Sequence, residues 1–526
     1  MSSNAITLSA SALKTISKRI RVPNYKRDAF PGIVHFGVGN FCRAHLFEYT
    51  HHFNNQTVGS ESIDNEPWLI HGIGVIDNDY EKESFEKIKS NDFLYGLLTL
   101  PSNESEIIGS LCSYDWAPDS STALTSAIDS ISRPETKIIS LTITEKGYCM
   151  DIDGNLDFSN PDVLHDVQLL TSSQDSFGTT TPCFKTSLGL LIEGLRQRMR
   201  NHLAGPVTIM SCDNLPSNGK VLKSILLDFV KHTNNLHLLN YIEENMSFPN
   251  SMVDRITPGV TEESISLFEK ETNVADPWPV IAEDFTQWVV EDNFIAGRPS
   301  WEDIEGSDIL FVEDCEPYEC MKLRLLNASH TAMAYVSILA GLEKVDDSMG
   351  DESVYGYVKS YMDMATSTVP RVPGIDLEEY KSVLRFRFSN LSDDLSRLAQ
   401  DGSKKMVGFV LPSLEIRLEK KQSTEMIATV VASWVHYLIK HANDVDDPRK
   451  DELVDLATAI TDSISCNDNE NTRLATTYFI RSTLGDHIAR EEKFVEEVEK
   501  YIYLIDKNGA KTAVLNKFEY FGLEEL

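Results

Sequence analysis

The sequence predicts an α/β protein with a parallel-rich sheet in its first half and a mainly α-helical second half. In the first half, short apolar runs rich in β-branched residues alternate with helical or loop-like segments, which is typical of a parallel sheet with crossover helices. After about residue 305 the apolar residues recur at helical spacing over long stretches. A chain of 526 residues exceeds one compact core. We therefore expect two domains, residues 1–305 and 306–526.

The strands and helices are predicted from apolar runs and from the turn residues that bound them. The first strand is predicted at Gly32–Val38, between a proline and a Gly-rich turn that leads into a helical pattern. The further strands of the first half are predicted at Trp68–Ile76, Lys137–Ile143 and Pro206–Met210. The helices of the second half are predicted at Met321–Leu342, Met426–Lys440, Thr472–Thr483 and Ile488–Ile505. The Pro- and Trp-containing segment Asp276–Glu302 is the expected crossing between the halves.

Composition excludes several classes of partner. Acidic residues number 81 and basic residues 48, for a net charge of −33, and such a surface repels the phosphodiester backbone of nucleic acids. The apolar share of 41% is ordinary for a globular protein. No apolar run reaches the length of a membrane span. We expect a small-molecule partner, with neither a nucleic acid nor a membrane.

The eight cysteines show no CxxC pair, so they predict buried thiols in a reducing compartment rather than a metal or redox site. A cytoplasmic location is therefore expected. The residues before Asp28 are basic and rich in serine, as in organellar transit peptides, which keeps import into an organelle as the alternative.

The Gly-rich turn after the first strand predicts a dinucleotide site. Gly37 and Gly39 would let backbone amides approach a pyrophosphate at the start of a helix, although Cys42 stands where the third glycine of the fingerprint is usual. Asp77 or Asp79, after the second strand, could bind the adenosine ribose, provided that residues 54–67 form a loop insertion. An acidic residue there favours NAD over NADP. A solvated turn is the alternative.

The residues assigned to the cofactor are Gly37, Gly39, Phe41, Arg43, Asp77 and Asp79.

A helix with polar groups among apolar ones is predicted at the start of the second half. At helical spacing Glu319, Lys322, Asn327 and His330 fall within an arc of roughly 140°. A lysine pressed against apolar neighbours loses hydration, its pKa falls, and it can act as a general base. The alternative is a lysine whose charged end reaches solvent beside a hydrogen-bonded core histidine.

A second polar cluster follows the strand at Pro206–Met210. Its loop carries Asn214, whose amide could donate a hydrogen bond to a ligand oxygen at the carboxyl edge of the sheet. An asparagine there is also a common turn former. The sequence has no HExxH, GxxxxGK[ST] or strand-to-helix GxSxG motif, which disfavours zinc proteases, phosphate-loop proteins and hydrolases of the Ser-elbow type.

Five strings resemble the polyol-specific long-chain dehydrogenases, the mannitol dehydrogenase family, in the order of that family. They are GVGNFCRAH from Gly37, SLTITEKGY from Ser140, SCDNLPSNG from Ser211, FPNSMVDRITP from Phe248 and MKLRLLNASH from Met321. The resemblance implies a Rossmann-like amino-terminal domain, a helical carboxyl-terminal domain and a site in the cleft between them. It also implies a monomeric, zinc-independent NAD(P)-linked oxidoreductase that uses no metal.

The resemblance assigns roles to single residues. Lys322 falls on the catalytic lysine, Asn214 and Asn327 on the paired amides, and His330 on the substrate-orienting histidine; Glu319 falls on a glutamate of a proton path. Asp254, Arg397 and Lys405 fall on polyol-binding positions. Lys146, where relatives have a small residue, and Asn78, often acidic in relatives, depart from the pattern on the cofactor side.

The expected activity is the NAD-dependent oxidation of a polyol to a ketose, D-mannitol to D-fructose and the reverse. Two alternatives stay open within the family, a uronate reductase and an arabinitol dehydrogenase, because Arg397 and Lys405 could pair with a carboxylate as well as with hydroxyls. A third alternative is a non-catalytic dinucleotide-binding protein.

Overall fold

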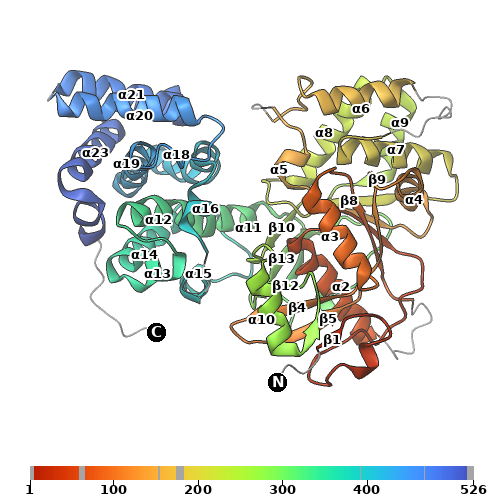
Figure 1. Cartoon of the computed structure of the whole chain (residues 1–526). Helices are drawn as coiled ribbons and strands as arrows, with labels where there is room; N and C mark the ends of the chain where they lie inside the picture. Colours follow the sequence, from red (N-terminus) through yellow and green to blue (C-terminus); the bar gives the residue numbers. More distant parts are fainter. Residues whose placement is uncertain are drawn as a thin grey trace. The chain divides into compact units, whose positions relative to one another are not determined.

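The computed structural model describes residues 5–57, 66–151, 154–172, 183–390, 393–466 and 468–517. The chain divides into two compact units, Met1–Glu316 and Pro317–Leu526 (Figure 1). In the part of the chain that is described, no helix has both the length and the apolar character needed to cross a membrane.

The first unit is built on a parallel sheet of six strands. Its strands are β2 (Ile33–Phe36), β3 (Ile70–Gly74), β6 (Leu111–Trp116), β7 (Ile138–Leu141), β8 (Val207–Ser211) and β9 (Met246–Ser247). Their spatial order is β6-β3-β2-β7-β8-β9. Counted along the chain this is 3-2-1-4-5-6, the strand order of dinucleotide-binding Rossmann folds, whose ligands bind where the order reverses. Here the order reverses between β2 and β7. The expected α/β class and Rossmann-like sheet are therefore confirmed.

The four strands predicted in this sheet are found; three of them are one or two residues shorter at each end than the sequence suggests, and the fourth is displaced by one residue. They are buried along their whole length, which explains why they read as continuous apolar runs rather than as alternating ones. The helices of this unit are α1 (Asn40–Arg43), α2 (Leu46–Thr57), α3 (Asp79–Ser90), α4 (Ser121–Ser132), α5 (Thr144–Gly147), α6 (Pro161–Ser172), α7 (Ser187–Arg200), α8 (Asn218–His232), α9 (Leu236–Asn245) and α10 (Glu262–Thr272).

Smaller sheets complete the first unit. One contains β12 (Val280–Glu283), β4 (Tyr95–Leu100) and β5 (Ser105–Ile108); another contains β10 (Ser251–Asp254), β13 (Gln287–Glu291) and β14 (Ile309–Val312); a third pairs β1 (Ile6–Thr7) with β11 (Val274–Ala275). The segment Asp276–Glu302 therefore does not cross between the halves, because it supplies β12 and β13 to the first unit.

The second unit contains only helices among its described residues, as expected (Figure 1, cyan to blue). They are α11 (Glu316–Met321), a π-helical segment Lys322–Asn327, α12 (Ala328–Leu339), α13 (Val345–Gly350), α14 (Glu352–Thr366), α15 (Leu377–Asn390), α16 (Leu395–Ala399), α17 (Gly402–Lys405), a second π-helical segment Met406–Val410, α18 (Leu411–Glu419), α19 (Glu425–Lys440), α20 (Lys450–Ser465), α21 (Asn469–Leu484), α22 (Asp486–Ala489), α23 (Glu492–Ala513) and a 3₁₀ turn at Leu515–Lys517.

Two predicted helices need correction. The predicted helix Met321–Leu342 is interrupted at its start by the π-helical segment, and Ile488–Ile505 is divided between α22 and α23. Helix α19 is buried on nearly all sides and packs against α12 and α23, which accounts for its strongly apolar sequence.

Candidate functional site

The Gly-rich turn lies at the carboxyl end of β2, beside the point where the strand order reverses. Gly37 has φ of +84°, and a Cβ atom there would lie 2.2 Å from the carbonyl oxygen of Thr142. Only glycine is compatible with both conditions. A Cβ at Gly39, in contrast, would meet no atom within 4 Å among the described residues. The turn is thus tightly packed at its first glycine and open at its second, where a ligand could approach the backbone.

Two residues predicted to bind the cofactor, Arg43 and Phe41, pack beside this turn. Arg43 is fully buried, and its guanidinium donates to the carbonyl oxygens of Trp278 (2.7 Å) and Gly39 (3.3 Å). Phe41 stacks on His45 with 4.9 Å between ring centroids. Cys42, in place of a third glycine, is buried with Sγ 3.2 Å from the carbonyl oxygen of Gly39. Hydrogen bonds from the side chains of Arg43 and Cys42 therefore stabilise the turn, although the third glycine of the dinucleotide-binding fingerprint is absent.

Asp77 and Asp79 are exposed at the end of β3, the strand next to β2. Asn78 lies between them and caps α3, since its side chain accepts a hydrogen bond from the amide of Glu81 at 2.8 Å. Helix α2 continues to Thr57, so the expected loop insertion at 54–67 starts later than predicted; residues 58–65 of it lie outside the described residues.

A buried histidine ties the ends of β2 and β7 together. His35 Nδ1 lies 2.8 Å from Ser140 Oγ, and its Nε2 lies 2.9 Å from Thr142 Oγ1. Thr142 Oγ1 in turn donates to the carbonyl oxygen of Gly37 at 2.8 Å. Burial lowers the pKa of His35 to about 3, so the ring is neutral at physiological pH. This network fixes the Gly-rich turn relative to the neighbouring strand.

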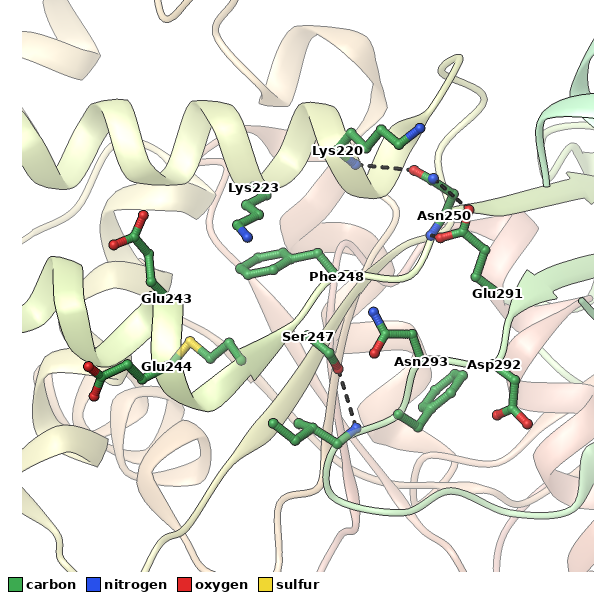
Figure 2. A pocket seen from close by; sticks show the side chains of 13 residues that line it. Lys220, Lys223, Glu243, Glu244, Ser247, Phe248, Asn250, Glu291, Asp292 and Asn293 are labelled. Atoms are coloured by element: carbon green, nitrogen blue, oxygen red, sulfur yellow. Dashed lines mark hydrogen bonds between the residues drawn. The ribbon is translucent and has the colours of Figure 1, made fainter. Parts of the chain in front are cut away.

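The loop after β8 carries Asn214, which is exposed at the carboxyl edge of the sheet. Asn218 anchors this loop from below, because its Nδ2 donates to the carbonyl oxygens of Asp213 (3.0 Å) and Ser251 (2.8 Å). Helix α8, which follows, is fastened by Asn250. The Asn250 side chain accepts from the amide of Lys220 at 3.1 Å and donates to Glu291 at 2.8 Å (Figure 2).

The pocket drawn in Figure 2 has a volume of about 560 Å³ and lies along β9, the last strand of the sheet. Its walls carry both Lys223 and the carboxylates of Glu243 and Glu244. Neither the Gly-rich turn nor Asn214 lines it. The pocket is therefore separate from the residues predicted to bind the cofactor.

In the second unit, Lys322 and Asn327 begin and end one π-helical segment. The hydrogen bonds of a π-helix join residues five apart, so they bring positions 322 and 327 onto one face, whereas the α-helix assumed from the sequence separates them. Lys322 is only 7% exposed. Such π segments in α-helices occur frequently at functional sites. The local geometry thus groups the predicted base with a predicted amide.

The neighbouring predicted residues are also enclosed. Glu319 is 7% exposed on α11, and His330 stacks on Phe388 of α15 with 4.0 Å between ring centroids. The side-chain oxygen Oδ1 of Asn327 is buried and accepts no hydrogen bond from the described residues. A buried amide oxygen in this state is costly unless a ligand or water pairs with it.

Arg397 and Lys405 lie together on α16 and α17. The Lys405 ammonium donates to the carbonyl oxygen of Leu398 at 2.9 Å and caps the end of α16. Arg397 is exposed, with Asp393 at 3.7 Å. Helix α12 contacts both α16 and α17. Lys322, Asn327, His330, Arg397 and Lys405 therefore sit on α12 or on elements that contact α12.

Asp254 is buried at the end of β10, and its neighbour Arg255 forms a buried ion pair with Glu48 of α2. Glu48, His52 and Glu106 place potential metal-ligand atoms within 4.8 Å of one another. His52 Nε2, however, donates to Glu106 at 2.9 Å, and the Arg255 guanidinium contacts Glu48. Both carboxylates thus already have hydrogen-bond partners, so the donor set is better explained as a buried hydrogen-bond network than as a metal centre.

Sequence reasoning missed several residues that shape the strand ends. Asp213, Tyr148, Thr142 and His35 are the main ones, and each makes contacts across large sequence separations. The only available signal was the position of Asp213 directly before Asn214.

Comparisons with known proteins find relatives over most of the chain. Residues 31–303 match the family model described as the mannitol dehydrogenase Rossmann domain, and residues 314–502 match the mannitol dehydrogenase C-terminal domain. Mannitol 2-dehydrogenase of Phaeosphaeria nodorum is 32% identical over 511 residues, covering 94% of this chain and 83% of that protein.

Two solved structures are similar over nearly the whole chain. One is Pseudomonas fluorescens mannitol 2-dehydrogenase in a ternary complex with NAD and D-mannitol, with a TM-score of 0.80 and 34% identity, covering 97% of this chain and 98% of that one. The other is a substrate-free D-sorbitol dehydrogenase, with a TM-score of 0.79 and 31% identity, covering 97% and 100%.

Proposed function

Since the chain belongs to the mannitol dehydrogenase family and is an oxidoreductase acting on a CH–OH group, we propose that it oxidises a polyol to a ketose with NAD, D-mannitol to D-fructose and the reverse. The observation that carries the proposal is the similarity, over 97% of the chain, to the Pseudomonas fluorescens enzyme in complex with NAD and D-mannitol. Residues 1–305 would bind the dinucleotide, and residues 306–526 would supply the base.

The residues at the end of β2 and β3 fit a dinucleotide. The open space at Gly39 leaves room for a pyrophosphate beside the backbone, and the exposed Asp77 and Asp79 can accept hydrogen bonds from ribose hydroxyls. The same carboxylates would repel a 2′-phosphate, which favours NAD over NADP. Bound nicotinamide would accept the hydride from the carbinol carbon.

We assign the proton transfer to Lys322. In oxidation its amine would take the hydroxyl proton, and in reduction its ammonium would return a proton to the ketone oxygen. Its burial supports this role, because a desolvated amine loses its proton more readily than one in water. Glu319, buried on α11, would exchange that proton onward. The step needs no metal ion, so treatment with a chelator is expected to leave turnover unchanged.

The amides of Asn214 and Asn327 would stabilise the negative charge that develops on the reacting oxygen. Asn327 shares the face of Lys322 on the π-helical segment, which supports their joint action. His330, held by stacking on Phe388, would orient the substrate. Asp254, Arg397 and Lys405 would bind the remaining hydroxyls of the polyol.

D-Sorbitol is a second candidate substrate, favoured by the similarity to a D-sorbitol dehydrogenase structure. The test is to assay the purified protein with D-mannitol, D-sorbitol, D-arabinitol and D-mannonate, each with NAD and with NADP, by the absorbance of the reduced nicotinamide. The highest kcat/KM is expected for D-mannitol with NAD. A preference for D-mannonate would instead indicate a uronate reductase, and no turnover with any substrate would favour a non-catalytic binding protein.

A further inference from the structure

A buried carboxylate joins the ends of two neighbouring strands at the sheet edge. Asp213, in the loop after β8, accepts hydrogen bonds from the backbone amides of Ile143 (3.1 Å) and Thr144 (2.8 Å), where the chain passes from β7 into α5. It also accepts from the Tyr148 hydroxyl at 2.8 Å, and that hydroxyl lies 2.6 Å from Ser211 Oγ. One side chain thus fastens two loops whose residues are about 70 positions apart in sequence.

The backbone amides that donate to Asp213 belong to a strained segment. Thr144 has φ of +61°, a conformation that costs a residue with a branched Cβ about 1–3 kcal/mol. Ile143 and Thr144 present two successive amides to one carboxylate, an arrangement that binds anions. The Asp213 carboxylate therefore stabilises a strained turn between β7 and α5.

Asp213 directly precedes Asn214, whose amide is the proposed donor to the reacting oxygen. Asn218 holds the Asp213 backbone from the opposite side, since its Nδ2 donates to the Asp213 carbonyl oxygen at 3.0 Å. With both its side chain and its main chain anchored, Asp213 leaves Asn214 little freedom. A donor that is held in place before the reaction stabilises charge better than a mobile one.

We propose that Asp213 is a positioning residue for the reaction, which holds the loops after β7 and β8 in one arrangement and so presents the Asn214 amide to the substrate oxygen. The inference rests on the proposed function, because it needs Asn214 to act on the substrate. Asp213 itself touches neither substrate nor cofactor in this account.

The charge state of Asp213 gives the proposal a second readout. Burial raises the pKa of Asp213 to about 6, although the Tyr148 hydroxyl and the amides of Ile143 and Thr144 act to lower it. Glu145 of α5 raises it further by charge repulsion. Cys212, the preceding residue, is buried and its own pKa is raised, so it is a neutral thiol in this range. Protonation would place a hydrogen on an oxygen that now accepts hydrogen bonds, and it would loosen both loops.

The test compares Asp213 with Asp166, two buried aspartates that each accept from two successive backbone amides and one hydroxyl; Asp166 also bonds to His165 Nδ1 at 2.9 Å. Asp166 of α6 is also fully buried, and it accepts from two successive backbone amides, Lys185 (3.0 Å) and Thr186 (2.8 Å), and from the Thr186 hydroxyl (2.8 Å). Its backbone-amide and hydroxyl partners directly precede α7, and none of them is a predicted site residue. D213N replaces an acceptor oxygen with an NH₂ group that faces donors, and D166N makes the same change at the matched position.

In the ketose-reducing direction, we expect D213N to lower kcat by about 100-fold, the cost of a small misplacement of a reacting group, with little change in the Kd for NADH. D166N should keep the kcat of the unchanged protein. The unchanged protein should also lose kcat as the pH falls through about 6. The acid limb is measured in reduction, the direction in which Lys322 is proposed to act as an ammonium, and D213N should lack it.

Y148F is a milder change than D213N, because it leaves the Asp213 carboxylate in place. It removes one donor to Asp213, so it should lower kcat less than D213N and move the acid limb to higher pH. Equal losses of kcat in D213N and D166N would overturn the inference, as would an acid limb that stays in place in both D213N and Y148F. If the unchanged protein turns over none of the polyols or ketoses, the proposed function fails; if it is active while D213N keeps normal kcat, only the inference about Asp213 fails.

Discussion

Lys322 and Asn327 stand at the two ends of a single π-helical segment, which places both side chains on one face of the helix that opens the second unit. An α-helix would separate positions five residues apart by more than a quarter turn. The departure from regular geometry therefore groups the proposed base with one of the two proposed oxyanion donors.

Asn327→Ala is expected to lower kcat by about 100-fold or more, the typical loss when one oxyanion donor is removed. The KM for the polyol should change much less, because the amide acts on charge that develops during the reaction. Steady-state kinetics checks both values. Asn471→Ala, at an exposed position of α21 in the same unit, is the control and should leave kcat unchanged. A KM effect without a kcat effect would contradict the assigned role.

The two glycines of the Gly-rich turn should respond differently to alanine. Gly37→Ala should lower the free energy of unfolding by more than about 1 kcal/mol, because its φ is positive and the new Cβ would meet Thr142. Gly39→Ala should leave stability nearly unchanged and weaken NADH binding, since the methyl group enters open space where the dinucleotide is proposed to lie.

Urea denaturation and NADH fluorescence titration measure the two effects. Gly259→Ala, at an unstrained open position, is the control for both. Normal NADH affinity in Gly39→Ala would argue against the proposed site.

The choice between NAD and NADP should depend on the acidic residues after β3. Asp77→Ser, and separately Asp79→Ser, should raise the ratio of kcat/KM for NADP to that for NAD by about tenfold, equivalent to about 1.4 kcal/mol. The reason is that each change removes a negative charge that we propose faces the 2′ position. Parallel assays with both cofactors give the ratio. An unchanged ratio in both variants would mean that other groups select the cofactor.

The pair formed by His52 and Glu106 should make stability depend on pH. Burial opposes charge on both groups, but their mutual hydrogen bonds outweigh it, so the pKa of Glu106 falls to about 2 and the pKa of His52 rises. The lowered pKa contributes stability above about pH 4.5, which is lost as pH falls through about 2. The raised pKa contributes stability below about pH 6.5, which is lost as pH rises through the folded value.

The loss of stability in Glu106→Gln should therefore be greatest between about pH 4.5 and 6.5. Urea denaturation of both proteins below, within and above this range measures it. A difference that is constant with pH would show that the pair does not titrate as described.

The sequence predicted the sheet because its strands are buried runs with turn residues at their ends, and such local patterns are visible without the fold. It did not predict the π-helical segment at Lys322, because an i→i+5 bond leaves no apolar periodicity of its own. Asp213 was missed for a different reason: its partners Ile143, Thr144 and Tyr148 lie far away in sequence. The small strands β4, β5 and β12 were missed because their pairing is set by tertiary contacts.

The proposed role of Lys322 is tested most directly by the turnover of Lys322→Ala with D-mannitol and NAD, on protein whose urea denaturation matches that of the unchanged chain. We expect kcat to be nearly abolished while NADH still binds. A kcat equal to that of the unchanged protein would show that another group moves the proton.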